Sequence, residues 1–382
     1  MSNYYLAVVF ITITSMMVGI IHFRENQTLS RKVKQPFLFI ASFIVLGVIC
    51  ECLGICLNSS TLPNTIEIHK LIKVIEFTIT PLIPAFYLKI FEYENIKKSI
   101  RVFAVALLVL NTVFEIINMG IPFVFYIDEN NVYQHGNFYI VYILIYCMEI
   151  GIFIFELLIY TKKYQIRNIA TLISIIAFLS IGLSIRIIDS SVNSDWLIVA
   201  ITYLLFIIYY SDLSLKVDPL TGLLNRKSYE HKLKKIDYTT AFIMMDINNF
   251  KQINDQLGHS MGDVFLKLVS SMIMENYSKY GYCYRIGGDE FCVILKAGVL
   301  EKETIETFSK LLDNLNSSFD KLLLAKSEDY PSLKYGVAKG YSIYFADYNQ
   351  NLFYENDPEY LLSIQKAIDS ADKMLYVDKK NK

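Results

Sequence analysis

The sequence predicts two domains of different fold class, an all-α membrane bundle followed by an α+β domain. Composition is the first indication, because 54% of the 382 residues are hydrophobic and the mean hydropathy is +0.37. The hydropathy pattern is the second indication. Long apolar runs fill residues 1–210, and alternating helical and strand-like patterns begin at residue 218. An apolar excess of this size is expected in segments of about 20 residues that cross a lipid bilayer.

The N-terminal region, residues 1–210, contains about seven apolar runs of spanning length. They are predicted at residues 4–22, 36–57, 71–91, 102–121, 138–160, 169–188 and 196–210. Pro81 and Pro84 lie in the third run, where the loss of backbone donors predicts a kink. We therefore expect a bundle of about seven transmembrane helices in contact with membrane lipid.

Basic residues between the runs predict the orientation of the bundle. The segments after the first, third and fifth runs carry Lys and Arg, whereas residues 1–5 and 128–137 carry none. The positive-inside rule then places the N-terminus outside and the C-terminal domain in the cytoplasm, in a plasma (inner) membrane. The basic residues are Arg24, Arg31, Lys32, Lys34, Lys97, Lys98, Arg101, Lys162, Lys163 and Arg167.

Four glutamates, Glu51, Glu76, Glu115 and Glu149, lie within the predicted spans. Ionisable groups in a membrane commonly face the bundle interior or water, where they mark ligand or proton sites. They also occur as polar contacts between helices or near lipid headgroups. For the mid-span residues Glu76 and Glu149 both interpretations stay open, and a signal ligand of unknown identity is expected for this domain.

A short helical linker is predicted at residues 211–217, which contain neither Gly nor Pro. The last span can continue as a helix through this segment until Asp218 and Pro219 stop it. The C-terminal domain, residues 218–382, then alternates between element types. Helices are expected at 228–235, 262–277, 301–319 and 359–378, and strands at 239–245, 282–286, 291–295 and 340–345.

Acidic residues flank a glycine turn in this domain. Asp246 follows the first strand, and Asp289 and Glu290 follow Gly287 and Gly288, a tight hairpin signal. If the hairpin lies beside the first strand, the carboxylates converge, and a bridging cation offsets their repulsion. Mg²⁺ or Mn²⁺, with substrate phosphates as further ligands, is the expected cation. Alone, the turn is equally compatible with a solvated hairpin.

Four blocks occur in order along the domain: DPLTGLLNR at 218–226, DINNFKQINDQLGHSMGD at 246–263, RIGGDEF at 285–291 and ADKMLY at 371–376. Together they resemble the GGDEF family of diguanylate cyclases. The resemblance implies an antiparallel sheet flanked by helices, similar to polymerase palms and nucleotide cyclases. It also implies GTP as substrate, cyclic di-GMP as product and a homodimer through this domain. The N-terminal region is similar to seven-span sensor modules only in texture.

The resemblance implies a catalytic and metal-binding set. Asp246 and Asp289 would hold the metal, with the Ile247 carbonyl and Glu290, and Asp289 would accept the proton of the 3′-hydroxyl. Lys251 would stabilise the transition state, although a solvated loop lysine is the alternative. The catalytic residues implied are therefore Asp289, Lys251 and Glu290.

The resemblance also implies a substrate-binding set. Asn254 and Asp263 match the pair that reads guanine, and Lys379 matches a phosphate-contacting lysine. His259 matches a pocket residue, although a loop histidine bonded to backbone is nearly as well supported. Phe250, Gly287 and Gly288 complete the set.

Three departures from the family pattern carry expectations. Asn248 stands where Asp is frequent, but that position is not a metal ligand. After Lys379 only three residues follow, so one phosphate-binding basic residue is expected to be absent. The product-inhibition motif of the family maps to Ser278 and Gly281, which lack the Arg and Asp that grip the product.

Three functions are weighed from the sequence. A diguanylate cyclase is favoured, and a GTP-binding receptor module that signals by protein contact is the alternative. A transporter with a regulatory tail is disfavoured, because the membrane region shows no visible repeat. A net charge of −1 gives no basic surface for nucleic acid, and the six cysteines lack the spacing of a zinc site.

Overall fold

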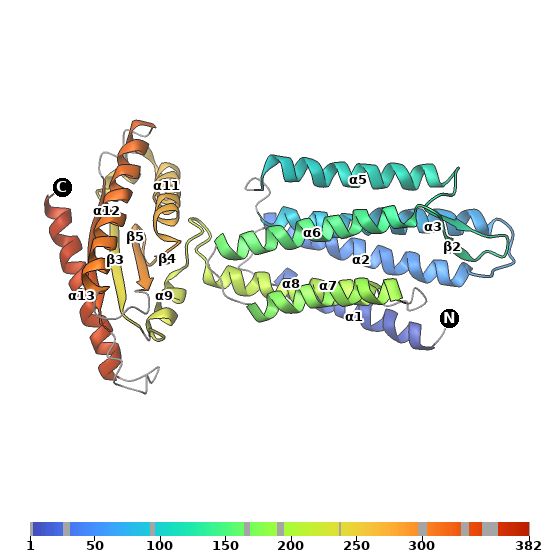
Figure 1. Ribbon diagram of the computed structural model, residues 1–382, viewed down its shortest axis with the longest axis horizontal. Helices are drawn as coiled ribbons and strands as arrows, with labels where there is room; N and C mark the ends of the chain where they lie inside the picture. Colours follow the sequence, from blue (N-terminus) through green and yellow to red (C-terminus); the bar gives the residue numbers. More distant parts are fainter. Residues whose placement is uncertain are drawn as a thin grey trace. The chain divides into compact units, whose positions relative to one another are not determined.

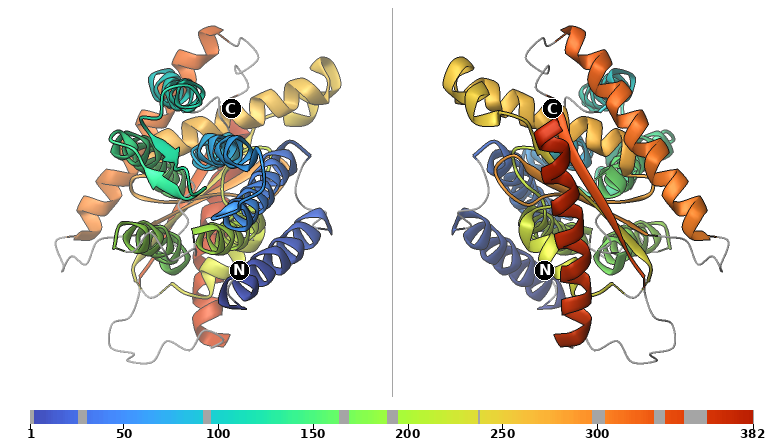
Figure 2. Two further views of the ribbon diagram at one scale, coloured as in Figure 1. Left: turned by 90° about the vertical axis from the view of Figure 1, so that its right-hand side faces the viewer. Right: turned by 90° about the vertical axis from the view of Figure 1, so that its left-hand side faces the viewer.

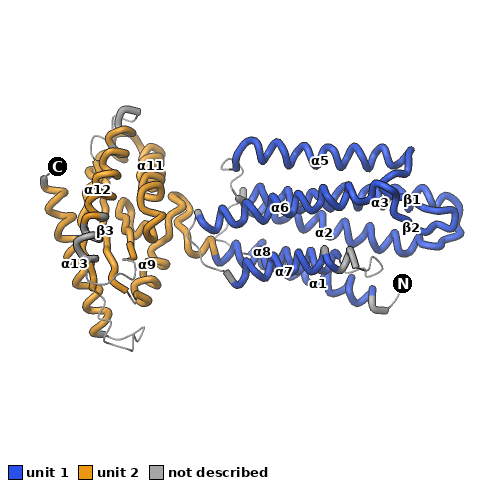
Figure 3. The backbone as a smooth tube through the Cα atoms, in the orientation of Figure 1, with its two compact units in different colours: residues 1–212 blue, residues 213–382 orange. Residues whose placement is uncertain are grey.

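The chain forms two compact units, Met1–Asp212 and Leu213–Lys382 (Figure 3). The structure, a computed structural model, describes residues 3–25, 31–91, 96–163, 169–188, 195–236, 238–296, 304–329, 336–345 and 358–381. Arg167 and the predicted helix start at Glu301 lie outside these described residues.

The first unit is helical. Its helices lie lengthwise beside one another (Figure 1), and the last of them continues past the end of the predicted span to Lys216. They are α1 (Asn3–Glu25), α2 (Arg31–Leu57), α3 (Thr65–Ile79), α4 (Leu82–Leu88), the 3-10 turn η1 (Lys89–Phe91), α5 (Lys98–Asn118), α6 (Tyr139–Lys163), α7 (Ile169–Ile188) and α8 (Asp195–Lys216).

Six described helices are long and apolar enough to cross a membrane. The sixth predicted span, residues 169–188, coincides with α7, whose described apolar stretch, Ala170–Gly182, is shorter than the others. Large apolar side chains such as Phe10, Phe103 and Ile116 are exposed on these helices, as expected for surfaces in contact with lipid. The six spans are Tyr5–Glu25, Val33–Leu57, Thr65–Leu88, Lys98–Asn118, Tyr139–Lys162 and Asp195–Lys216.

The predicted kink in the third span is confirmed. α3 ends at Ile79 and α4 begins at Leu82, so that Pro81 lies at the break. Proline has no N–H to donate to the carbonyl four residues earlier, which belongs to Phe77. The Asn111 Nδ2 atom of α5 donates to this carbonyl instead, at 3.0 Å. A neighbouring helix therefore satisfies the group that the proline leaves free.

A β-hairpin is present in the segment between the fourth and fifth predicted spans, where only a loop was expected. Its strands, β1 (Phe125–Ile127) and β2 (Tyr133–His135), are antiparallel and have three residues each. Asn131 adopts a left-handed conformation with φ of 60° in the turn. Its Nδ2 atom donates to the Leu57 carbonyl at 2.8 Å, which ties the hairpin to the end of α2.

Two of the four membrane glutamates make polar contacts. Tyr5 Oη donates to Glu51 at 2.7 Å, and Lys73 Nζ donates to Glu76 at 2.7 Å. The contact with Tyr5 supports the interpretation of Glu51 as a polar contact between helices. Glu76 is paired with the ammonium group of Lys73. Glu115 and Glu149 are completely buried, and within the described residues neither carboxylate has a hydrogen-bond partner.

The second unit contains an antiparallel sheet with the strand order β4-β5-β3-β6. This arrangement confirms the predicted α+β class with helices on the faces of the sheet. The strands are β3 (Thr240–Ile247), β4 (Gly281–Arg285), β5 (Glu290–Lys296) and β6 (Val337–Tyr344). The helices are α9 (Arg226–Leu233), α10 (Phe250–Leu257), α11 (His259–Tyr277), α12 (Thr304–Asp329) and α13 (Pro358–Asn381).

The hydrophobic core lies on one face of this sheet. Alternate residues of the central strand β3, among them Ala241, Ile243 and Met245, pack with buried side chains of α11 and α12, including Phe265 and Phe319. Every residue of β3 is buried, as expected for a central strand covered on both faces. Because this core lies wholly within unit 2, the unit has what an independently folding domain requires.

Helix α13 covers the opposite face, where Figure 2 shows it crossing the strands. Gly340 of β6 pairs with Met244 of β3 on this face. A Cβ atom on Gly340 would clash with the backbone of Ala371 and Leu375 in α13, so glycine permits the close approach. Since side chains alternate along a strand, Asp246 lies on the same face as Met244 and is directed toward α13.

Candidate functional site

The acidic residues of the predicted site meet at one end of the sheet. β3 and β5 pair antiparallel, with Asp246 directly opposite Glu290. The Ile247 amide donates to the Asp289 carbonyl at 3.3 Å, which holds the hairpin turn beside the end of β3. The pairing of the two strands therefore brings Asp246, Asp289 and Glu290 together, as expected if the hairpin lies beside the first strand.

Lys379 joins this group from the far end of the chain. Its Nζ atom lies 2.6 Å from Asp246 Oδ1, and the Asp246 side chain is only 12% exposed. The contact follows from the fold, because α13 lies on the sheet face to which Asp246 is directed. The structure thus places a cation against the most buried carboxylate of the site.

The carboxylates influence one another electrostatically. Burial and the negative charge of Asp246 raise the pKa of Asp289 above its usual range, while the ammonium of Lys379 acts in the opposite direction. Removing water disfavours the charged form, and a neighbouring like charge adds to that cost. A cation bound between Asp246 and Asp289 would lower the pKa of Asp289 again.

The two glycines of the turn have different surroundings. The amides of Ile286 and Gly287 donate to the Glu290 carbonyl at 3.0 and 3.3 Å and close the turn. A Cβ atom on Gly287 would clash with the Glu290 carboxylate, whereas one on Gly288 would meet nothing within 4 Å. A side chain at Gly287 would displace the exposed Glu290 carboxylate, whereas Gly288 leaves open space in which a ligand can approach the backbone.

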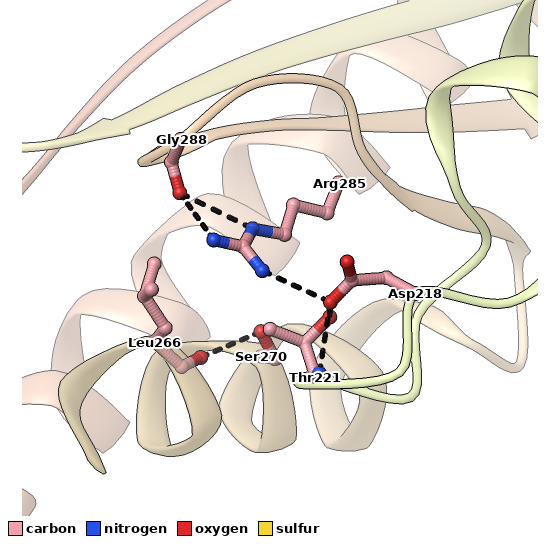
Figure 4. Close-up of polar contacts among 6 residues, drawn as sticks. All are labelled: Asp218, Thr221, Leu266, Ser270, Arg285 and Gly288. Carbon is pink, nitrogen blue, oxygen red and sulfur yellow. Dashed lines mark hydrogen bonds and ion pairs between the residues drawn. The ribbon is translucent and has the colours of Figure 1, made fainter. Parts of the chain in front are cut away.

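Arg285 ties this turn to the first motif of the domain (Figure 4). Its Nε and Nη2 atoms donate to the Gly288 carbonyl at 3.1 and 2.7 Å, and Nη1 donates to Asp218 Oδ1 at 3.0 Å. The same Asp218 oxygen accepts from the backbone amide and the hydroxyl of Thr221, at 2.9 and 2.6 Å. One side chain thus fixes both the glycine turn and the segment that enters the domain.

Arg285 and Asp218 lie in two of the sequence motifs, but no separate role was predicted for either residue. The two residues meet because the backbone of the first motif pairs with β4. The Leu224 amide donates to the Cys283 carbonyl, and the Arg285 amide donates to the Leu224 carbonyl. The signal available in the sequence was an arginine directly before a glycine turn, with an aspartate in a separate block. Only the fold shows that the two meet.

The predicted substrate-binding residues lie on the helix pair that follows β3. Phe250 begins α10 and packs against the core, while Lys251 is exposed and has no ion-pair partner among the described residues. Asn254 places its side-chain oxygen where a Cβ atom on Gly262 would lie, so Asn254 sits against the first turns of α11.

His259 and Asp263 are exposed and lie one turn apart on α11. Gly258 separates the two helices with a φ of +82°, a conformation that favours glycine. The close contact of Asn254 with Gly262 therefore brings Asn254 and the neighbouring Asp263, the pair expected to read guanine, to the same helix junction.

Asn248, which was not expected to ligate a metal, has an unusual environment. It is 5% exposed, and neither atom of its amide group has a hydrogen-bond partner among the described residues. Its backbone amide donates to the Gly336 carbonyl at 3.1 Å, which fixes its place directly after β3. Sequence reasoning missed this feature, because an unsatisfied buried amide is visible only once its surroundings are known.

The positions of the family inhibition motif are occupied differently here. Ser278 follows α11 as its C-cap, and Gly281 begins β4. A Cβ atom on Gly281 would clash with the Ile294 carbonyl and would crowd Leu295 of β5. The backbone of β4 is therefore too close to its neighbour for an aspartate at this position without a shift of the strand.

Oxygen atoms suited to a hard cation are present at the sheet end. They belong to the Asp246 and Asp289 carboxylates and to the carbonyl of Ile247, the last residue of β3. Among the described residues, however, no group of three or more His, Cys, Asp and Glu side chains is close enough to enclose a metal ion. A cation at this position therefore needs further ligands, which substrate phosphates can supply.

Comparison with known proteins identifies the second unit. Residues 215–346 match the family described as "Diguanylate cyclase, GGDEF domain", and this part of the chain is a GGDEF domain. The match spans three of the four motifs that carried the resemblance, and the fourth, at residues 371–376, lies beyond it.

Curated relatives match over the same part of the chain. The probable diguanylate cyclase DgcJ of Escherichia coli (strain K12) is 32% identical over 172 residues, which cover 43% of this chain and 29% of DgcJ. Diguanylate cyclase DosC of the same organism is 30% identical over 171 residues, which cover 43% of this chain and 33% of DosC. The chain spans about a third of the length of these relatives.

A solved structure of the coiled coil and GGDEF domain of DgcB from Caulobacter crescentus, in complex with c-di-GMP, is also similar. It is 21% identical, covers 52% of this chain and 95% of its own, and gives a TM-score of 0.35.

Proposed function

We propose that this protein is a membrane-bound diguanylate cyclase, which condenses two GTP molecules into cyclic di-GMP with release of two pyrophosphates. The observation that carries the proposal is the meeting of Asp246 and Asp289 beside an open glycine turn, inside a GGDEF domain. The relatives DgcJ and DosC, which are named diguanylate cyclases, support the same activity.

The residues have distinct proposed tasks. Asp289 accepts the proton of the attacking 3′-hydroxyl, because its carboxylate lies on the glycine turn beside the end of β3. Lys251, exposed at the start of α10, meets the charge that develops on the transferring phosphate. Asn254 and Asp263 bind the guanine edge, because a carboxylate accepts from the N1–H and amino group that adenine does not present in this way.

The remaining residues complete the substrate site. Lys379, held beside Asp246, lies where it can contact a phosphate, and Gly288 lets the triphosphate approach the backbone. His259 on α11 and Phe250 on α10 are assigned to contact the substrate, and the Gly287 amide, which donates to the Glu290 carbonyl, helps to close the turn.

The donor set is suited to Mg²⁺ or Mn²⁺. Asp246, Asp289 and Glu290, with the Ile247 carbonyl, are the groups that would hold the ion. When bound, the ion polarises the α-phosphate and offsets its charge. Without it, Lys379 is the cation that balances Asp246.

Two domains are needed for one product. Each GGDEF domain holds one GTP, and each 3′-hydroxyl must attack the α-phosphate of the other nucleotide. A homodimer with a two-fold axis satisfies this requirement, because both half-sites then face each other. Control of this dimer is the proposed route by which the N-terminal unit regulates synthesis.

The proposed location is a plasma (inner) membrane. Six helices with exposed apolar surfaces support membrane insertion, and the basic loops support an outside N-terminus and a cytoplasmic GGDEF domain. Sensing of a signal ligand by the N-terminal unit completes the proposal.

The test is product formation by the full chain in detergent, supplied with GTP and Mg²⁺ and analysed by chromatography. Asp246→Ala and Asp289→Ala should each abolish turnover, since each removes a group required for phosphoryl transfer. Lys251→Ala should lower kcat more than it raises KM. Glu275→Ala, an exposed change on α11, is the control and should leave the rate unchanged. Retained GTP binding without product would assign a binding module instead.

A further inference from the structure

The N-terminal unit contains a partly open cavity of about 70 Å³, lined by residues of α3, α6, α7 and α8. Two carboxylates, Glu76 and Asp195, border it, and no basic side chain is among the described lining residues. Glu76 is 6% exposed and is paired with Lys73 on the same helix at 2.7 Å. Two carboxylates therefore border the cavity, and Lys73, the partner of Glu76, is not among the described lining residues.

Aromatic rings form much of the same wall. Phe77, Tyr142, Tyr146 and Trp196 all line the cavity. Trp196 is 5% exposed, and a Cβ atom on Gly47 of α2 would clash with its indole ring. The ring is therefore held in place by direct contact with the backbone of α2. Rings with a negative face beside carboxylates attract ammonium groups and repel anions.

A second cavity continues from the first. The two share Tyr146, Ile150 and other lining residues, and the second reaches Tyr87 and Thr202. The hydroxyls of Tyr87 and Thr202 are buried and have no hydrogen-bond partner within the described part of the chain. Leaving such groups unpaired is costly unless a guest or water contacts them. Polar positions thus extend beyond the acidic end of the cavity.

We propose that this cavity is a binding site for an organic cation. The ammonium group lies between Glu76 and Asp195 against the aromatic rings, and an apolar body extends along Leu179 and Val199. Binding depends on unit 1 alone, whereas a regulatory effect of the ligand rests on the proposed function. α8 supplies Trp196 and Val199 and is also the helix that leads into the second unit, so it is the element through which binding would act.

The chain offers a site-specific signal for binding. It contains a single tryptophan, and this residue lines the cavity. Tryptophan emission of the full chain in detergent is titrated with three probes of similar size: phenethylamine, phenethyl alcohol and phenylacetate. The amine should change the emission saturably, while the neutral alcohol and the anion should do so only at much higher concentration. An equal response to all three probes would show an apolar cavity without charge selectivity and would overturn the proposal.

Two variants test the acidic groups. Asp195→Asn and Glu76→Gln should each weaken phenethylamine binding by about tenfold. Glu67→Gln is the matched control, because Glu67 lies on the same helix with its side chain 70% exposed and outside the cavity. Glu76→Gln removes the partner of Lys73 and could impair folding. If Glu76→Gln does not yield folded protein, the affinity of Asp195→Asn alone tests the site. Unchanged affinity in Asp195→Asn would overturn the assignment.

Cyclic di-GMP synthesis is measured on the same preparation, so that the two proposals are separated. Saturable amine binding without product formation would support the site and count against the cyclase. Product formation without any amine-specific change in emission would do the reverse.

Discussion

At the scale of single residues, Arg285 shows how one side chain can organise a site without reacting. Its guanidinium donates three hydrogen bonds, two to the Gly288 carbonyl and one to Asp218. The planar fork of arginine makes this geometry possible, and an ammonium group cannot reproduce it. The glycine turn, and with it Asp289, is therefore positioned by a residue that lies outside the proposed chemistry.

We expect Arg285→Lys to destabilise the GGDEF domain by about 1–3 kcal/mol, since the partly buried Asp218 and the exposed Gly288 carbonyl lose charge-assisted hydrogen bonds. Urea unfolding of a fragment spanning residues 213–382 measures the change. The control is Arg226→Lys, which alters only an exposed pair with Glu230 and should shift stability by less than about 0.5 kcal/mol. Equal stability of the two variants would show that the fork geometry is unimportant.

Asp289 predicts a pH dependence with a definite sign. Because its folded pKa is raised, the folded state holds the proton more readily than the unfolded state. Its contribution is most favourable below the ordinary Asp pKa of about 4 and is lost as pH rises through the raised value. In metal-free buffer, the stability gained by Asp289→Asn over the native fragment should therefore increase with pH. A constant difference between the two proteins from acid to neutral pH would contradict this explanation.

At the scale of elements, the contact between β6 and α13 decides whether Lys379 reaches the site. α13 crosses the sheet at Gly340, where its backbone lies too close for any side chain. This approach places the end of the helix over Asp246. The sequence predicted both elements, but the glycine that allows their contact was not recognised as a packing position.

Gly340→Ala should push α13 away from the sheet and destabilise the fragment by about 1–3 kcal/mol, as overpacking does elsewhere. Synthesis of cyclic di-GMP by the full chain should fall as well, because Lys379 moves with the helix. Ser370→Ala, an exposed change on α13, serves as the control for both measurements. Native stability and rate in Gly340→Ala would mean that α13 tolerates a larger separation.

Two elements escaped sequence-based prediction for physical reasons. α10 has only eight residues, which is too short for a clear helical periodicity. It begins after Asn249, whose left-handed conformation, with a φ of 55°, is not a usual helix start. The β1–β2 hairpin has strands of three residues, too short for an alternating pattern. Its position depends on Asn131, which contacts Leu57 far away in the sequence.

At the scale of the whole molecule, the absence of the family inhibition motif has a structural basis. Gly281 lies so close to β5 that a side chain there would clash with the Ile294 carbonyl. Ser278, at the end of α11, offers a hydroxyl where a guanidinium would bind phosphate or guanine with two donors. The chain thus lacks both partners for the product at this surface.

We therefore expect synthesis to continue in the presence of added cyclic di-GMP. Progress curves of the full chain, recorded with and without added cyclic di-GMP, measure the rate of synthesis. Weak inhibition at high product concentration through other basic groups, such as Lys279, is compatible with the prediction. Arrest at low-micromolar product, together with binding mapped near Ser278, would refute it.

The sequence by itself determined the division into an apolar helical region and an α+β domain, the kink at Pro81 and the convergence of Asp246 with Asp289. These features follow from hydropathy, backbone chemistry and strand pairing, which act locally or through a simple register. Only the tertiary structure decided that Arg285 holds Asp218, that the Asn248 amide is buried with no hydrogen-bond partner in the described part of the chain, and that acids and rings of several helices surround one cavity. Such features arise where distant segments meet, and the packing that brings them together leaves no periodic pattern in the chain.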